Sequence, residues 1–171
     1  MSNIKIINYP EMKVIMRKDF SYHFSAHFEN ITKETGATYF GHNFIKNYRE
    51  KGHTISTFCN KEEWHELYWS KYRNDDPLEK ICHQSVQKSN FAAVSWSIES
   101  DISPCCQQRM KLTKTSDGLT FSFKRKENYN ETFIFGWDKL KTDRLDADYI
   151  FHLASLLKPL RDYHWEVHDK V

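Results

Sequence analysis

The sequence predicts an α/β/α sandwich with a five-stranded antiparallel sheet and both termini in helical layers. Three observations support this fold. The 171 residues include only 5 Gly and 4 Pro and show no repeat or linker, so residues 1–171 are expected to form a single domain. Strand-like runs occur in pairs joined by short polar loops, which is typical of hairpins. The helical stretches between them have one apolar face each and are able to cover both faces of a sheet.

The amino-terminal stretch up to about Thr35 favours a helix. Phe20, Phe24 and Phe28 are spaced four residues apart, so they would form an apolar stripe along one side of a helix. Gly36 would end that helix, because glycine readily adopts the left-handed conformation found after a last helical turn. We therefore expect the chain to begin in a helical layer.

A hairpin and two helices are expected next. Strand-like runs at residues 37–48 and 53–59 flank a short polar loop that contains a glycine. A helix is predicted over residues 61–72. Asp76-Pro77 then begins another helix, because aspartate is a good N-cap and proline suits the first helical position. The glutamate two residues after the proline would complete a capping box.

The second half of the chain predicts three strands and two helices. A strand is expected at residues 91–98 and a helix from Ser103 to about residue 114. Strands at 119–124 and 131–137 alternate apolar and polar residues on either side of a polar loop. An amphipathic helix over 146–160 closes the fold.

Composition and motif searches exclude several classes of protein. With 25 basic and 23 acidic residues the net charge is only +2, which argues against a domain that binds nucleic acid mainly by charge. No apolar run is long enough to span a membrane, and no signal peptide is evident. The 4 cysteines and 9 histidines show no CxxC, HExxH or HxH pattern, and His23 and His27, four residues apart, have no third metal ligand nearby in the sequence. No nucleophile motif or phosphate-binding glycine loop occurs. We therefore expect a cytoplasmic protein with reduced thiols, without a metal or cofactor and without enzymatic activity.

One aromatic pattern carries functional information. Trp64, Tyr68 and Tyr72 recur every four residues, and Asp76 follows at the same step. Each step of four drifts by only ~40° around a helix, so the three rings share one face with the carboxylate just beyond it. Such rings and a carboxylate could surround a small amphiphile, donating to its carbonyls and accepting from an amide N–H. Alternatively, the stripe is ordinary core and Asp76 only caps a helix.

The segment Trp64-x3-Tyr68-x3-Tyr72-x3-Asp76-Pro77, followed by an amphipathic helix and then Trp96, resembles the signature of the ligand-binding domain of LuxR-type quorum-sensing regulators. The order of the expected elements is similar as well, so the resemblance covers nearly the whole chain. It implies the family fold, a five-stranded antiparallel sheet between two helical layers of the PAS/GAF-like kind.

The resemblance also implies roles for individual side chains. Trp64 would donate its indole N–H to the lactone carbonyl of an N-acyl homoserine lactone, and Asp76 would accept from the amide N–H of the ligand. Tyr68 would lie along the acyl chain, and Tyr72 would fill the approach to Asp76.

A second aromatic residue is expected over the head group of the signal. The resemblance assigns this place to Trp96, with Phe91 as the other candidate. The chain is thus expected to be the sensory domain of a bacterial, LuxR-type transcriptional regulator. It would bind an acyl homoserine lactone or a related amphiphile, form a homodimer and contact DNA only through a C-terminal domain that these residues do not include. The alternative is a ligand-free interaction or dimerisation module of the same fold with a filled aromatic core.

Overall fold

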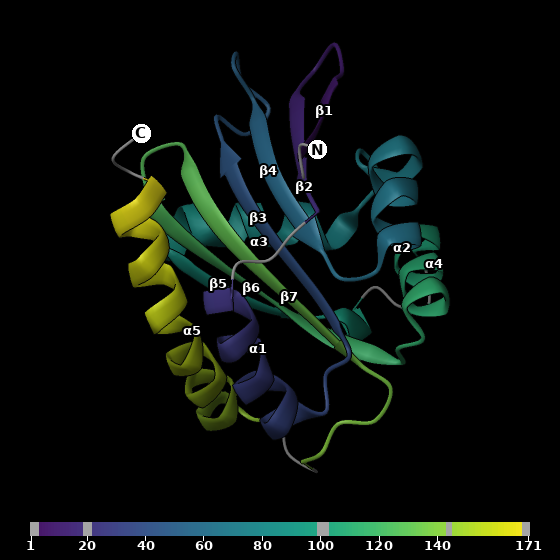
Figure 1. Ribbon diagram of the computed structural model, residues 1–171, viewed down its shortest axis with the longest axis vertical. Helices are drawn as coiled ribbons and strands as arrows, with labels where there is room; N and C mark the ends of the chain where they lie inside the picture. Colours follow the sequence, from purple (N-terminus) through teal and green to yellow (C-terminus); the bar gives the residue numbers. More distant parts are fainter. Residues whose placement is uncertain (1–3, 19–21, 99–102, 143–144, 169–171) are drawn as a thin grey trace.

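The computed structural model describes residues 4–18, 22–98, 103–142 and 145–168 (Figure 1). Phe20 and the side chain of Phe24, two members of the predicted amino-terminal stripe, lie outside the described residues and side chains. In chain order the elements are β1 (Ile4–Asn8), β2 (Lys13–Arg17), α1 (Tyr22–Thr35), β3 (Tyr39–Lys46), β4 (Thr54–Cys59), α2 (Glu62–Leu67), the π-helix η1 (Tyr68–Tyr72), α3 (Pro77–Ser89), β5 (Phe91–Ser95), the 3-10 turn η2 (Trp96–Ile98), α4 (Pro104–Thr113), β6 (Asp117–Lys126), β7 (Tyr129–Trp137) and α5 (Ala147–His168).

The sheet has seven strands in the order β1-β2-β4-β3-β7-β6-β5. All neighbours pair antiparallel except β2 and β4, which run parallel. The prediction of an α/β fold is confirmed, and the five predicted strands correspond to β3 to β7. The prediction of a five-stranded, purely antiparallel sheet is wrong, because an additional hairpin extends the sheet beyond β4.

That hairpin is formed by the amino-terminal residues, which were expected to be helical. Residues 4–17 make two strands of five residues each, joined by a turn in which the backbone N–H of Tyr9 donates to the carbonyl of Met12 at 2.9 Å. Val14 and Met16 are buried, whereas Lys13 between the turn and Val14 is exposed. This alternation is a strand signal, but it is too short to outweigh the helical spacing of the phenylalanines that follow. The helix begins only at Tyr22.

The helices cover both faces of the sheet. In Figure 1, α1 and α5 lie side by side in front of the strands, and α3 passes behind them. The front layer packs on a phenylalanine-rich core, in which Phe121, Phe133 and Phe135 of the sheet meet Leu153 and Leu157 of α5. The other face of the sheet is covered by α2, η1, α3 and α4. The core between the sheet and these helices contains four of the six predicted site residues, namely Trp64, Tyr68, Tyr72 and Trp96.

Several helix boundaries confirm the sequence signals. Asp76 is the N-cap of α3, and its carboxylate accepts from the backbone N–H of Leu78 at 3.0 Å. Ser103 caps α4 in the same way, accepting from Cys106 N–H at 3.2 Å. The expected capping box does not close, because the carboxylate of Glu79 accepts instead from the hydroxyl of Tyr48 at 2.8 Å.

Other boundaries differ from the prediction. The helix expected over residues 61–72 is α-helical only as far as Leu67 and continues as the π-helix η1. The strand expected over 91–98 ends at Ser95 and is followed by the turn η2. The polar loop between β6 and β7 is shorter than expected, because both strands extend into it.

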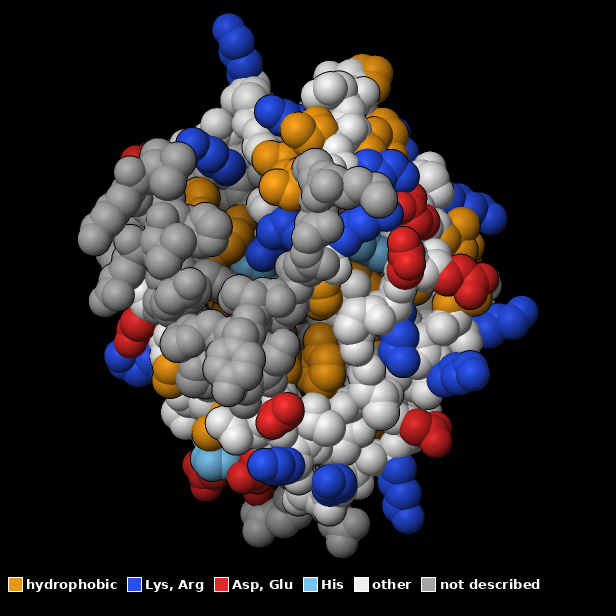
Figure 2. Space-filling model, viewed as in Figure 1, with side chains coloured by type: hydrophobic (Ala, Val, Ile, Leu, Met, Phe, Trp, Pro, Cys, Tyr) orange, Lys and Arg blue, Asp and Glu red, His pale blue; other side chains and the backbone are white. Residues whose placement is uncertain are grey.

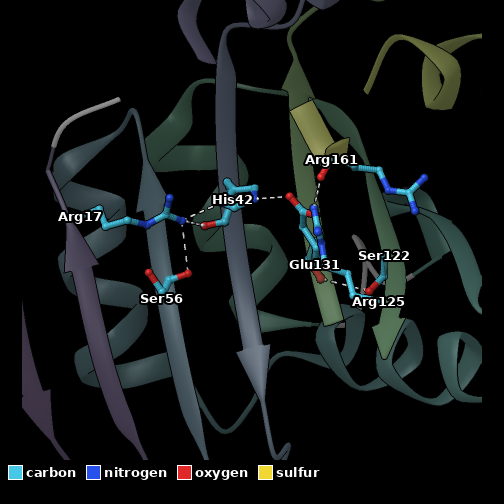
Figure 3. Close-up of polar contacts among 8 residues, drawn as sticks. Arg17, His42, Ser56, Ser122, Arg125, Glu131 and Arg161 are labelled. Carbon is cyan, nitrogen blue, oxygen red and sulfur yellow. Dashed lines mark hydrogen bonds and ion pairs between the residues drawn. The ribbon is translucent and has the colours of Figure 1, made fainter. Parts of the chain in front are cut away.

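A network of charged side chains crosses the sheet close to this end of β6 and β7 (Figure 3). Glu131 of β7 accepts from Arg125 of β6, with Nε at 2.6 Å, and lies 2.9 Å from Nε2 of His42 on β3. Arg17 of β2 donates to Nδ1 of His42 at 2.7 Å. Because arginine only donates, His42 accepts at Nδ1 and carries its proton on Nε2, facing Glu131. Arg125 also donates to the carbonyl of Arg161 in α5, so the network ties four strands to a helix.

The surface charges of the described residues match the near-neutral charge balance of the sequence. On the face shown in Figure 2, lysine and arginine side chains are spread among aspartates and glutamates rather than gathered in one patch. None of the described helices is long and apolar enough to cross a membrane. All 4 cysteines are free thiols.

Candidate functional site

The sheet and the second helical layer enclose a cavity of about 50 Å³. Its walls come from β3, β4, β6 and β7 on one side and from α2, η1, α3 and α4 on the other. By volume it offers room for about three to five water molecules. Three of the six predicted site residues line this cavity, namely Trp64, Tyr68 and Asp76.

The four-residue spacing brings the aromatic side chains together as expected. The ring centroid of Trp64 lies 5.6 Å from that of Tyr68 and 5.9 Å from that of Tyr72. Trp64 is buried, and both tyrosines are partly buried beside it. Tyr72 packs behind Trp64 without lining the cavity. Trp69, which the spacing did not single out, is also buried and lines the cavity from η1.

The two remaining candidates lie on different faces of the sheet. Trp96 belongs to the same helical layer as Trp64 and is almost fully buried. Its close packing depends on Gly118, where an added Cβ would come within 2.5 Å of the indole ring. Phe91 points to the opposite face and packs in the core below α5, with its ring centroid 5.2 Å from that of Phe123. It therefore does not reach the cavity.

Asp76 forms a buried ion pair that the sequence did not predict. Its second carboxylate oxygen lies 2.5 Å from Nη2 of Arg109, which belongs to α4. Both side chains are more than nine-tenths buried. The carboxylate therefore has two tasks within the protein, capping α3 and balancing the charge of Arg109.

Aromatic rings surround the guanidinium of Arg109. Its central carbon lies 5.5 Å from the ring centroid of Trp64, 6.0 Å from that of Tyr68 and 5.4 Å from that of Trp96. These distances are within the range in which a cation is attracted to the face of an aromatic ring. The aromatic side chains predicted from the spacing therefore form a cage around a cation of the protein itself.

Trp96 uses its indole N–H within the protein, donating to the hydroxyl of Thr120 at 3.1 Å. Tyr39 belongs to the same buried cluster as Trp64, and burial raises the pKa of its hydroxyl well above the usual range. Trp64 lines the cavity, where the resemblance assigns its indole N–H to a ligand carbonyl.

The floor of the cavity is polar. It is made by side chains that alternate with the core residues along the strands: Asn43, Thr57, Thr120, Ser122, Asn130 and Thr132. Ser122 and Thr132 hydrogen-bond each other at 3.1 Å. The side-chain oxygens of Asn43 and Asn130 are buried and have no hydrogen-bond partner among the described residues. A molecule bound against this floor would meet acceptors that need a donor.

A wider groove of about 440 Å³ adjoins the cavity. The two share Asn43, Ile45, Tyr68, Trp69 and Glu79 as lining residues. Beyond these, the groove is bordered by the β1–β2 turn, the loop between β3 and β4 and the start of α3. Its lining mixes charged and polar side chains with an apolar and aromatic set, and this set could contact the less polar part of a ligand. The apolar and aromatic residues are Met12, Ile45, Tyr48, Ile55, Tyr68 and Trp69.

Glu79 stands at the junction of the cavity and the groove and is expected to respond to pH. Burial raises its pKa to about 7, although the hydrogen bond from Tyr48 counteracts the shift. The folded protein thus holds this proton more tightly than the unfolded chain does. The stabilisation is complete below about pH 4.5 and is lost as the pH rises through 7.

Glu79→Gln should therefore remove a pH dependence of stability. Between pH 4.5 and 8 the free energy of unfolding of the wild-type protein should fall by on the order of 3 kcal/mol because of this group, and that fall should be absent in the variant. Urea denaturation at a series of pH values measures the difference. Glu63→Gln, at an exposed position on α2, is the matched control and should keep the wild-type profile. Parallel profiles for wild type and Glu79→Gln would contradict the assignment.

Comparison with known proteins gives matches only at the level of structure. No protein-family model matches the chain, and no curated protein does. The structure of SdiA from Escherichia coli superposes with a TM-score of 0.55, 12% identity and coverage of 82% of this chain and 60% of that chain. The structure of SdiA in complex with octanoyl-rac-glycerol superposes with a TM-score of 0.54 and 11% identity, over 84% of this chain and 62% of that chain.

A second protein has a similar structure. CepR2 from Burkholderia cenocepacia, described as an N-acylhomoserine lactone dependent LuxR family transcription factor, superposes with a TM-score of 0.50 and 16% identity over 75% of this chain and 72% of that chain. This chain spans about 60% of the length of the SdiA chain. The described residues thus have the fold of the autoinducer-binding domain of LuxR-family regulators.

Proposed function

We propose that this chain is the sensory domain of a LuxR-type transcriptional regulator and binds a small amphiphilic signal between the sheet and helices α2 to α4. The observation that carries the proposal is the polar-floored cavity beside Trp64, Tyr68 and Asp76, continued by a wider groove whose lining includes apolar and aromatic side chains. DNA contact would then be made by a separate domain, and the regulator would act as a homodimer.

The volumes suggest how an amphiphile would be divided between the two spaces. Small-molecule sites usually measure ~300–1,000 Å³, so the cavity of about 50 Å³ has room for a head group only. The groove of about 440 Å³ would hold the apolar remainder. N-acyl homoserine lactones and acylglycerols both have this division into a polar head and an apolar chain, and both are suitable first probes.

A second function is favoured by one observation. The small volume of the cavity reflects the fact that Arg109 and the rings around it occupy much of the space between the sheet and α4. A ligand-free interaction or dimerisation module would have such a self-filled site. Ligand-coupled stability separates the two functions, because only a sensor gains stability from a small molecule.

A thermal-shift experiment with N-octanoyl homoserine lactone and octanoyl-rac-glycerol tests the proposal. A ligand present at 100 times its dissociation constant and bound only by the folded state adds about 2.7 kcal/mol, which raises the melting temperature by roughly 5–10 °C for a chain of this size. Octanol and glycerol, supplied separately at the same concentrations, control for solvent effects. An unchanged melting temperature with both amphiphiles would favour the ligand-free module.

A further inference from the structure

In this chain, the carboxylate that was expected to hold the amide of a ligand head group is already bound to other parts of the protein. Asp76 bonds Arg109 and the N-terminus of α3. A ligand that used this carboxylate would have to break internal bonds. Recognition at lower cost would use polar atoms that line the cavity and lack strong partners.

Arg109 has such atoms. Its guanidinium carries five N–H donors, and only one strong bond is made, from Nη2 to Asp76 at 2.5 Å. Nη1 reaches the sulfur of Cys106 at 3.7 Å, and Nη2 reaches the sulfur of Cys105 at 3.9 Å, both weak acceptors. Nε is buried and has no partner among the described residues.

The guanidinium is also held in a fixed position. The rings of Trp64, Tyr68 and Trp96 lie around it, and the ion pair with Asp76 orients it. Arg109 lines the cavity and is only 3% exposed, so a group that meets its free donors is itself shielded from water. In a buried site of this kind, a hydrogen bond from the guanidinium to an oxygen acceptor is stronger than its present contacts with the two sulfur atoms.

The charge balance indicates which kind of acceptor fits. Asp76 already neutralises Arg109, and Glu79 borders the same cavity. A carboxylate on the ligand would add an unbalanced negative charge in a buried site, which is costly. A neutral carbonyl, as in a lactone, ester or amide, adds an acceptor without a charge.

The polar floor on the opposite side of the cavity has acceptor oxygens to which a ligand could donate a hydrogen bond. The side-chain oxygens of Asn43 and Asn130 are buried without a partner in the described part of the chain. They belong to the adjacent strands β3 and β7, so they lie on the same floor. An amide N–H or a hydroxyl close to the carbonyl of the ligand would satisfy one of them.

We propose that Arg109 is the head-group residue of this site and donates from Nε and Nη1 to a neutral carbonyl oxygen of a ligand that also carries an N–H or O–H donor for Asn43 or Asn130. The assignment rests on the proposed function. It places the selectivity of the site on α4, where the head group of a neutral amphiphile would meet Arg109.

Arg109→Lys tests the assignment, since lysine keeps the charge opposite Asp76 and removes the Nε and Nη1 donors. Affinities for N-octanoyl homoserine lactone, octanoyl-rac-glycerol and octanoate are measured by calorimetry on folded wild type and variants. The wild type should bind at least one neutral probe at least ten times more tightly than octanoate. Arg109→Lys should weaken the binding of that probe at least tenfold. Lys111→Ala, at an exposed position on the same helix, should bind like the wild type.

A second measurement is independent of whether the variant folds well. In nuclear magnetic resonance spectra of the wild type, the Nε–H signal of Arg109 should shift when the neutral probe is added. A wild type that binds a neutral probe with this signal unmoved, or Arg109→Lys binding it equally well, would overturn the assignment and leave the sensory function standing. Tighter binding of octanoate would also overturn it. A wild type that binds none of the three probes would contradict the sensory function and the assignment together.

Discussion

Replacing Asp76 by asparagine is expected to destabilise the protein by about 3–5 kcal/mol, the usual cost of removing one partner from a buried ion pair. Asparagine caps a helix about as well as aspartate does, so capping alone would make the change nearly silent. The cost arises at Arg109, whose buried positive charge would lose the carboxylate 2.5 Å away. The difference between the two expectations is large enough for urea denaturation to resolve.

Two further variants make the result specific to the ion pair. Asp75→Asn changes the exposed neighbour of Asp76 and should stay within about 0.5 kcal/mol of the wild type. In the double variant Asp76→Asn/Arg109→Met the buried charge is removed as well, so much of the lost stability should return. A single Asp76→Asn variant as stable as the wild type would show that the ion pair does not support the fold.

Glu131→Gln is expected to have a loss of similar size, about 3–5 kcal/mol. The carboxylate of Glu131 is fully buried and accepts from Arg125 and His42, while Arg17 donates to the other side of His42. Glutamine preserves the shape and removes the charge that balances these arginines. Its amide also cannot accept at both positions, so one of the two donors would lose its acceptor.

The matched control for this variant is Glu127→Gln in the exposed turn between β6 and β7, which should leave the midpoint of urea denaturation unchanged. Because the network joins β2, β3, β7 and β6, the loss should appear as a lower midpoint of one cooperative transition. A Glu131→Gln variant with the wild-type midpoint would contradict this account of the network.

Local spacing predicts much of this fold because local contacts produce it. The alternation in β6 and β7 and the stripe of leucines in α5 each reflect a face buried against the phenylalanine core. Asp76-Pro77 marks the start of α3 because capping is an interaction within one turn. By contrast, β1 and β2 are short, and β2 pairs with a strand that follows much later in the chain. The alternation of side chains within a five-residue strand does not indicate which distant strand it pairs with.

The same distinction applies to the site. Trp64 and Tyr68 come together because they are four residues apart along α2 and its continuation η1, and Asp76 follows shortly after as the N-cap of α3. Arg109 is 33 residues from Asp76 and meets it only through the packing of α4. One signal in the sequence was available, since Cys105, Arg109 and Thr113 are spaced four residues apart and all three are buried. An arginine on the buried face of a helix indicates a partner elsewhere in the fold.

The parallel pairing of β2 with β4 also affects the order in which the chain is assembled. During synthesis the hairpin of β1 and β2 leaves the ribosome before β4, and the edge on which it docks does not exist until residue 59 has emerged. Until then Val14 and Met16 have no core to enter and remain open to wrong contacts. The hairpin is therefore translated before the strand that completes its place in the sheet, and the position of β2 is set by a strand made after it.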